Sequence, residues 1–171
     1  MAIIFGTDFS EQATVAAHAA AALAQRGGEA LHLAHVLDYG SAGRSPSTEE
    51  ALRREATSRL EQQAAELRRR EVPVTTHLLD GAPDEVLVEL AAQIHAPLLV
   101  LSHHGQRAPR WRIGSVVERV VQAARCPVLV VRSGSSEVGQ RAARYPRQDV
   151  AAAPAERPGV QDGDAVVPGQ R

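Results

Sequence analysis

Short apolar runs alternate with longer amphipathic segments along residues 1–132 of the chain. The apolar runs are typical of buried strands, and the amphipathic segments have the three- and four-residue spacing of helices. The predicted strands cover residues 2–5, 30–38, 72–79, 97–102 and 127–131. Helices are predicted between them, at about residues 11–26, 46–70, 83–94 and 115–124. This alternation favours an α/β fold, in which helices cross over between parallel strands with right-handed connections.

We therefore predict a five-stranded, parallel, doubly wound sheet with helices on both faces. The run 97–102 is continuously apolar, which is typical of a strand buried on both sides. Pro73 favours an edge position for the strand that contains it. In folds of this class, ligands bind at the carboxyl ends of the strands, near the point where the strand order reverses. Residues directly after the strands are therefore the first candidates for function.

The helix ends and apolar faces give finer expectations. Ser10 is expected to cap the first helix, and Ser47 with Glu50 fits a capping box at the start of the second. The second and fourth helices should each bury one apolar face. In the second helix this face is a stripe formed by Leu52, Ala56, Leu60, Ala64 and Leu67. In the fourth helix it is the side formed by Val117, Val120, Val121 and Ala124.

Beyond Arg132 the composition changes. Residues 133–171 are rich in Ser, Gly, Pro, Ala and Gln and show no periodicity. Such a segment buries too little apolar area to offset its ordering entropy. We expect one domain over residues 1–132 and a disordered C-terminal tail over 133–171, with a docking role for the tail as the alternative.

Charge and composition exclude several classes of function. The chain has 19 basic and 20 acidic residues, which gives no basis for binding nucleic acid or an acidic membrane surface. Every basic residue is an arginine, so mechanisms that need a lysine are excluded. No apolar run approaches the roughly 20 residues that a membrane span needs. The single cysteine, Cys126, forms no internal disulfide and is expected to be a buried apolar residue, so we expect a cytoplasmic setting.

Three features are expected to meet at one edge of the sheet. Asp8 directly follows the first strand, where its carboxylate can accept hydrogen bonds from a ribose or a base. Gly114 and Ser115 open the fourth helix, whose N-terminal amides suit a phosphate. Gly105 lies in the arginine-rich loop before that helix. Each feature alone has a structural alternative, as a turn residue, a helix cap or a solvated loop, but together they favour a ligand site.

The seven histidines do not form a recognisable metal motif. No pair has helical ligand spacing, and no Cys/His cluster is present. His103 and His104 should point to opposite sides of their strand, and His35 is expected to be structural. We predict no metal site.

The segments "TDFSEQA", "LHLAHVLD", "GAPDEVLVELA", "LLVLSHHG" and "GSVVERVVQAARCPVLVVR" resemble the universal stress protein family over residues 1–132. The resemblance implies a five-stranded parallel sheet and a homodimer, often paired through the last strand. That strand carries Val128, Leu129, Val130 and Val131 here. An apolar edge strand of this kind would be covered by a second copy in an isologous dimer.

The family divides into members that bind ATP and members that do not, and binders carry the pattern G-x2-G-x9-G-[S/T]. Here Ser102 replaces the first glycine, and the gap from Gly105 to Gly114 is one residue short. The resemblance places Asp8 at a nucleotide contact and the backbone of Val36 against adenine. The implied nucleotide-binding set is Asp8, Val36, Ser102, Gly105, Gly114, Ser115 and Val116.

Three functional hypotheses remain at this point. The first is a cytoplasmic regulatory or protective module of the stress response that binds ATP, with or without magnesium, and is not an enzyme. The second is a nucleotide-free member that acts through protein contacts. The third is a nucleotide-dependent transferase, which would need a second substrate pocket and a catalytic base that the sequence does not reveal.

Overall fold

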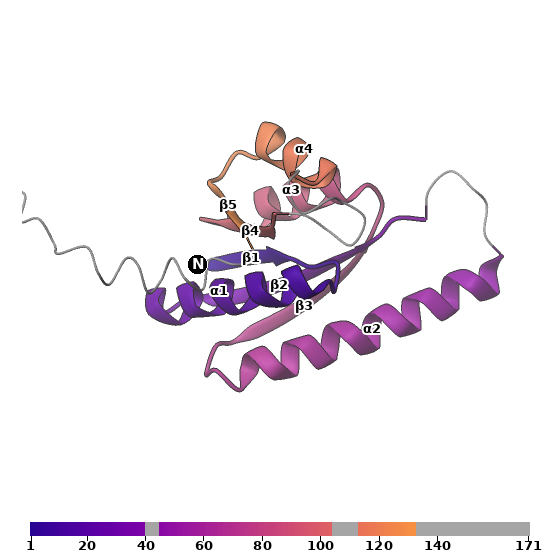
Figure 1. The fold of residues 1–171 in the computed structure, drawn as a ribbon, viewed down its shortest axis with the longest axis horizontal. Helices are drawn as coiled ribbons and strands as arrows, with labels where there is room; N and C mark the ends of the chain where they lie inside the picture. Colours follow the sequence, from indigo (N-terminus) through magenta and orange to yellow (C-terminus); the bar gives the residue numbers. More distant parts are fainter. Residues whose placement is uncertain (40–44, 104–112, 133–171) are drawn as a thin grey trace, which may run out of the picture.

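The computed structural model of the chain describes residues 1–39, 45–103 and 113–132. Its strands and helices alternate in the predicted order (Figure 1). They are β1 (Ala2–Gly6), α1 (Glu11–Gly27), β2 (Ala30–Leu37), α2 (Pro46–Arg68), β3 (Val74–Asp80), α3 (Pro83–Gln93), β4 (Leu99–Ser102), α4 (Ser115–Ala123) and β5 (Val128–Val131). The predictions for residues 104–112 and 133–171, among them Gly105 and the tail, lie outside the described residues.

The strands form one parallel sheet in the order β3-β2-β1-β4-β5, which confirms the predicted α/β fold. The chain moves outward from β1 to β2 and β3, then returns to the other side of β1 for β4 and β5. The order therefore reverses between β1 and β4. β3 is an edge strand as predicted, and Pro73 directly precedes it, where the missing N–H does not interrupt the sheet.

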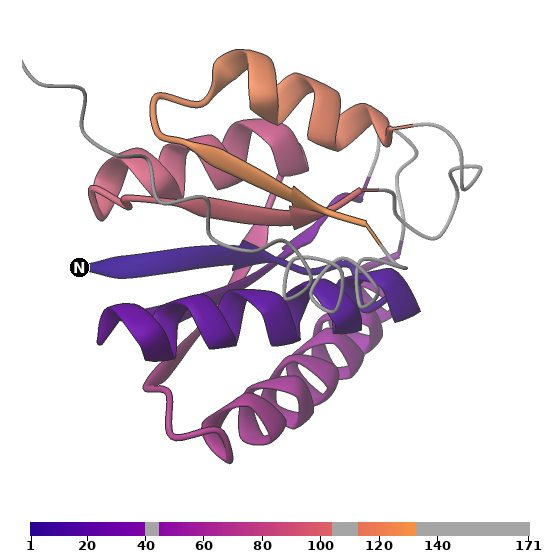
Figure 2. The same ribbon diagram turned by 60° about the vertical axis from the view of Figure 1, so that its left-hand side comes forward.

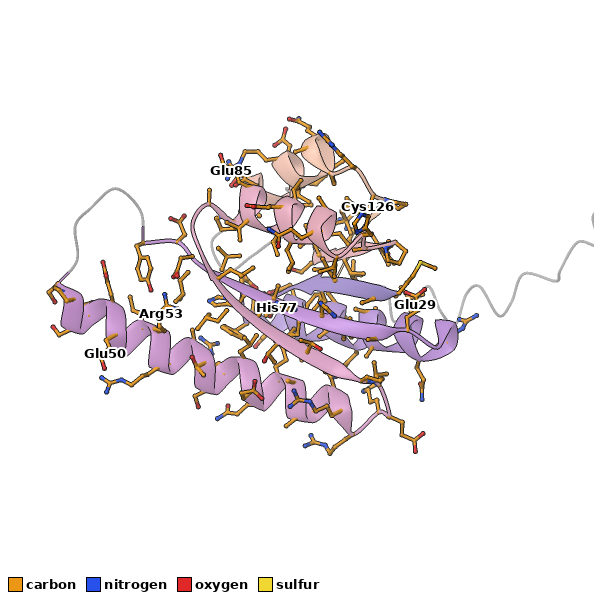
Figure 3. All side chains as sticks on the ribbon, turned by 180° about the vertical axis from the view of Figure 1, so that it is seen from behind. Glu29, Glu50, Arg53, His77, Glu85 and Cys126 are labelled. Atoms are coloured by element: carbon orange, nitrogen blue, oxygen red, sulfur yellow. The ribbon has the colours of Figure 1, made fainter. Side chains whose placement is uncertain are left out.

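The sheet separates two helical layers, with α1 and α2 on one face and α3 and α4 on the other (Figure 1, Figure 2). Alternate residues of β2 supply both cores: Leu31 and Leu33 pack toward α1 and α2, and Ala34 packs toward α3 and α4. β4 is buried along its whole length, which confirms the prediction made from its continuous apolar run. Cys126 is only half-buried, beside the core under α3 and α4 (Figure 3).

The helix ends follow short-range chemistry. The Ser10 hydroxyl accepts a hydrogen bond from the Ala13 amide at 3.1 Å, which confirms it as the cap of α1. The predicted cap of α2 is wrong: Ser45 caps it, accepting from the Thr48 amide at 3.3 Å. Because Pro46 already occupies the first helical turn, Ser47 lies inside the helix, and its hydroxyl is 3.0 Å from that of Ser45.

The predicted apolar side of α4 is too wide. Val117 and Val120 are buried, but Val121 is 53% exposed. Ala124 follows the helix as its extended C-cap residue. The reason is geometric: α4 is an outer helix, so only a narrow stripe packs inward, and a step of about 100° per residue turns Val121 out of it.

Gly6, the last residue of β1, lies close to two leucine side chains. A Cβ at this position would lie 2.7 Å from Leu101 Cδ2 and 3.0 Å from Leu87 Cδ1. We expect Gly6→Val to lower the free energy of unfolding by about 1–3 kcal/mol, because the added side chain would overlap the buried side chains of Leu101 and Leu87. Urea unfolding measures this, with Gly27→Ala as the control because its added Cβ comes no closer than 3.4 Å, to the flexible Glu29. Unchanged stability of the valine variant would show that the two leucines repack freely.

Candidate functional site

A cavity of about 690 Å³ opens at the carboxyl ends of the strands, where the strand order reverses. Its walls come from the ends of β1, β2 and β4, the first turns of α3 and α4, and Leu52 of α2. Cavities that bind small molecules have volumes of about 300–1,000 Å³ and lie at this position in doubly wound sheets. The fold alone therefore makes this cavity the first candidate for a ligand.

All described members of the predicted nucleotide-binding set line this one cavity. They are Asp8, Val36, Ser102, Gly114, Ser115 and Val116. They come from four elements or their adjoining turns, and the sheet topology brings them together. Gly105 lies outside the described residues.

Asp8 lies in a tight turn that joins β1 to α1. Its Oδ1 accepts from the Ser10 amide at 3.0 Å, and the Thr7 hydroxyl accepts from the Phe9 amide at 3.1 Å. Phe9 adopts the left-handed φ of 59°, which is uncommon for a residue with a side chain. Asp8 therefore shapes the turn and also lines the cavity, so the structural and functional interpretations of this residue are compatible.

The backbone of Val36 faces the cavity because β2 continues past the end of β1. The Leu31 amide and the Leu37 carbonyl bond toward β3, so odd-numbered residues of β2 direct their backbone groups that way. The backbone groups of even-numbered residues of β2 point toward β1, as shown by the 2.9 Å bond from the Thr7 amide to the Ala34 carbonyl. The β1–β2 pairing ends at Ala34. Val36 therefore presents an N–H and a C=O where β1 no longer supplies partners.

The N-terminus of α4 forms another wall. The Gly114 amide donates to the His103 carbonyl at 3.1 Å, and the His103 amide donates to the Val131 carbonyl at 2.8 Å. These bonds tie the helix start to β4 and β5. The amides of Ser115, Val116 and Val117 occupy the first helical turn, where amides lack intrahelical partners and the helix dipole is positive. This end of the cavity suits an anion.

Gly114 is not needed for the turn itself. Its φ of −65° and ψ of 144° are open to any residue, and no side chain caps the helix there. The backbone conformation therefore does not explain why glycine stands at this position. Because the Gly114 amide already bonds to His103, the amides that follow it are the ones left for an anion.

An ion pair that the sequence analysis missed crosses the cavity rim. Arg119 Nε donates to Asp84 Oδ2 at 2.8 Å, and Arg119 Nη2 donates to Asp84 Oδ1 at 3.0 Å. The Asp84 side chain is only 14% exposed, and the hydrogen bond from Arg119 lowers the pKa of its carboxyl. This fork-shaped contact fixes the first turns of α3 and α4 relative to each other. One indication of this ion pair was present in the sequence, because both helices are predicted to begin at the carboxyl edge of the sheet.

A second ion pair connects α2 to the sheet. Arg53 Nη2 donates to Asp80 Oδ1 at 2.7 Å, which ties α2 to the end of β3. Figure 3 shows Arg53 on the side of α2 that faces the sheet. Leu52, predicted as part of a buried stripe, is instead partly exposed and lines the cavity. Its neighbours in that stripe, Ala56 and Leu60, are buried as predicted.

Two histidines that are distant in the sequence meet on the sheet. His77 Nε2 lies 2.9 Å from His32 Nδ1, and their ring centroids are 4.8 Å apart. Within residues 1–39, 45–103 and 113–132, no group of three or more His, Cys, Asp or Glu side chains is arranged to hold a metal ion. Burial lowers the pKa of both imidazoles, and for His77 the neighbouring His32 adds to this effect.

The lowered pKa of these histidines predicts a loss of stability in acid. Below their ordinary value of 6.5 the unfolded chain takes up protons while the folded pair does not. The free energy of unfolding should therefore decrease as the pH falls below 6.5, until the folded pair is protonated too. In the double variant His32→Asn, His77→Gln this decrease should be smaller, because amides keep the contact but do not titrate. Equal pH profiles in urea unfolding would contradict the prediction.

The topology and the cavity define a class: a doubly wound α/β protein with a ligand cavity at the switch point of its sheet. A sequence model of the universal stress protein family matches residues 1–132. The chain therefore belongs to the universal stress protein family.

Individual relatives agree with this assignment. The chain is 29% identical to universal stress protein MJ0577 of Methanocaldococcus jannaschii over 155 residues, which cover 78% of this chain and 96% of that protein. The solved structure of MJ0577 superposes with a TM-score of 0.67, covering 77% of this chain and 95% of that one. A family member from Burkholderia pseudomallei is 31% identical with a TM-score of 0.63, covering 77% and 96%.

A universal stress protein solved in complex with cAMP shares the fold, with 24% identity and a TM-score of 0.63 over 77% of this chain and 97% of that one. None of the helices in the described ranges is both long enough and apolar enough to cross a membrane.

Proposed function

We propose that this protein is a cytoplasmic adenine-nucleotide-binding module, with ATP as its ligand, that acts in a regulatory or protective role and not as an enzyme. The observation that carries the proposal is the convergence of three groups on one cavity. These are the Asp8 carboxylate, the backbone N–H and C=O of Val36 that face the cavity, and the N-terminus of α4.

The three groups match the three parts of a nucleotide. A carboxylate accepts from ribose hydroxyls, and helix N-terminal amides bind phosphate. The N–H and C=O of one residue complement the ring nitrogen and amino group on one edge of adenine. Ser102 lies at the end of β4 in the same cavity and is 8% exposed. The proposed site residues are Asp8, Val36, Ser102, Gly105, Gly114, Ser115 and Val116.

The relative solved with cAMP supports nucleotide binding by this fold, but not ATP binding in particular. At 24% identity it shows that a protein of this fold holds an adenine nucleotide. The case for ATP in the present chain rests on its own cavity residues, with magnesium as an expected companion of the phosphates.

Calorimetric titration with ATP and magnesium tests the proposal on the full chain. Saturable heat with one site per chain is the expected result. Trp111 is the sole tryptophan and lies between β4 and α4 in the sequence, so its fluorescence gives an independent signal. The absence of heat at millimolar ATP would reject the proposal and favour a nucleotide-free module that acts through protein contacts.

We also propose that two copies pair through β5. β5 is an edge strand, and Leu129 on it is 38% exposed, so pairing would cover both an unpaired backbone edge and an apolar side chain. Light scattering from micromolar to millimolar concentration should show a dimer, and Leu129→Arg should shift it toward monomer. Leu23→Arg is the matched control, since Leu23 is similarly exposed at 36% but lies on α1 and not on β5. A constant monomer mass for the unaltered chain would exclude the dimer.

A further inference from the structure

The hydrogen-bond ladder between β1 and β2 is interrupted by a side chain. The Thr7 amide donates to the Ala34 carbonyl at 2.9 Å, and the next bond of a parallel ladder would run from the Val36 amide to the Thr7 carbonyl. That bond is not made. The Thr7 carbonyl instead lies 2.8 Å from Nδ1 of His35. The imidazole thus contacts the carbonyl that would accept the Val36 amide in a continued ladder.

The chemistry of this contact defines the state of the ring. A carbonyl oxygen only accepts, so Nδ1 must carry the proton and donate. Burial is the main influence on the His35 imidazole and lowers its pKa, which leaves the ring neutral at neutral pH. A neutral ring with its proton on Nδ1 can make this bond without placing a charge beside the cavity.

Packing from two other segments holds the ring in place. The Phe9 ring lies against the His35 ring, with centroids 4.2 Å apart and an interplanar angle of 35°. The guanidinium of Arg59, on α2, lies 4.7 Å from the centre of the Phe9 ring, and its Nη2 donates to the Phe9 carbonyl at 3.2 Å. Arg59 of α2 and His35 of β2 therefore both contact Phe9 and hold the left-handed turn in place.

We propose that His35 is a positioning residue that determines base specificity: by holding the Thr7 carbonyl, it keeps the Val36 amide available to an adenine ring. The inference rests on the proposed function and deepens it. Without the imidazole donor, the Thr7 carbonyl is free to accept the Val36 amide. The ladder then extends by one bond, and the edge of β2 that would recognise the base is lost.

Two substitutions separate the donor from the ring. His35→Asn keeps an N–H donor near the position of Nδ1 but removes the ring that packs on Phe9. His35→Phe keeps a ring against Phe9 but removes the donor. If the donor matters, only the phenylalanine variant should lose base specificity, and if packing alone matters, the asparagine variant should be the more damaged.

The binding readout compares ATP with ITP, whose base reverses the donor and acceptor on the edge in question. We expect the preference for ATP to decrease at least about tenfold in His35→Phe and to stay within about threefold in His35→Asn. Affinity for ITP should not change in either variant. Parallel losses of ATP and ITP affinity, or an unchanged preference in the phenylalanine variant, would overturn the proposal, because general damage to the site lowers both.

Hydrogen exchange of the free protein provides a readout that does not need nucleotide binding. In the unaltered chain the Val36 amide should exchange rapidly, while the Ala34 amide inside the ladder is protected. In His35→Phe the Val36 amide should become protected, and in His35→Asn it should remain rapid. A protected Val36 amide in the unaltered chain would overturn the inference. Rapid exchange with no nucleotide binding would reject the proposed function while supporting the structural role of His35.

Discussion

Replacing Gly114 by valine is expected to weaken ATP binding about a hundredfold while the domain stays folded. The residue precedes the α4 amides that would hold phosphate, and a branched side chain there would keep phosphate oxygens away from them. A hundredfold loss corresponds to about 2.7 kcal/mol, which lies within the range of about 1.5–3 kcal/mol for the loss of one hydrogen bond to a charged group. The backbone conformation at Gly114 is an extended one that valine readily adopts, so the substitution does not require the backbone to change.

Calorimetry with ATP and with adenosine measures the effect. Adenosine lacks phosphate, so its affinity should be the same in the valine variant as in the unaltered chain. Gly114→Ala should give an intermediate loss for ATP, and thermal unfolding checks that each variant is folded. If adenosine and ATP lost affinity equally, the phosphate would not bind at the start of α4.

Replacing Asp8 by alanine is expected to weaken ATP binding about ten- to a hundredfold. The carboxylate is proposed to accept from the ribose hydroxyls, and hydrogen bonds to a charged acceptor contribute more than neutral ones. Asp8 also accepts from the Ser10 amide, so part of the loss will come from the turn. Asp8→Asn keeps an oxygen for that amide and should retain the turn while losing the charge.

Dideoxy-ATP, which lacks both ribose hydroxyls, isolates the ribose contribution. The unaltered chain should bind it about as weakly as the alanine variant binds ATP, and Asp8→Asn should bind it as well as the unaltered chain does. A full loss of ATP affinity in Asp8→Ala together with an equal loss for dideoxy-ATP would assign Asp8 to the turn alone.

Most of the architecture follows from patterns within single elements. The burial of β4 and the Ser10 cap were predicted because apolar runs and capping depend on neighbours a few residues away. The wrong predictions also concern single residues, one at a helix end and one on a helix face. Ser45 rather than Ser47 caps α2, because Pro46 sets the helix start, and Val121 is exposed, because sequence spacing does not show how deeply a helix is packed.

The cavity depends on contacts between elements, and sequence reasoning reached it only in part. The residues directly after strands were found because the carboxyl ends of parallel strands share one edge. The pair formed by Arg119 and Asp84 was not found, since the two residues lie on different helices and only the sheet brings those helices side by side. The contact of His32 with His77 was missed for the same reason, because it needs the β2–β3 register.

The sequence by itself determined the order of strands and helices, the doubly wound class and the membership in the family, since these depend on periodicity and on motifs that are local in the chain. Only the tertiary structure decided that the Gly114 amide is already bonded to His103 and that the His35 imidazole contacts the Thr7 carbonyl. Gly6 likewise faces two leucines from β4 and α3 that no local pattern connects to it. The physical reason is that each hydrogen-bonding group has few partners, and which partner it takes is settled when distant segments meet in one register.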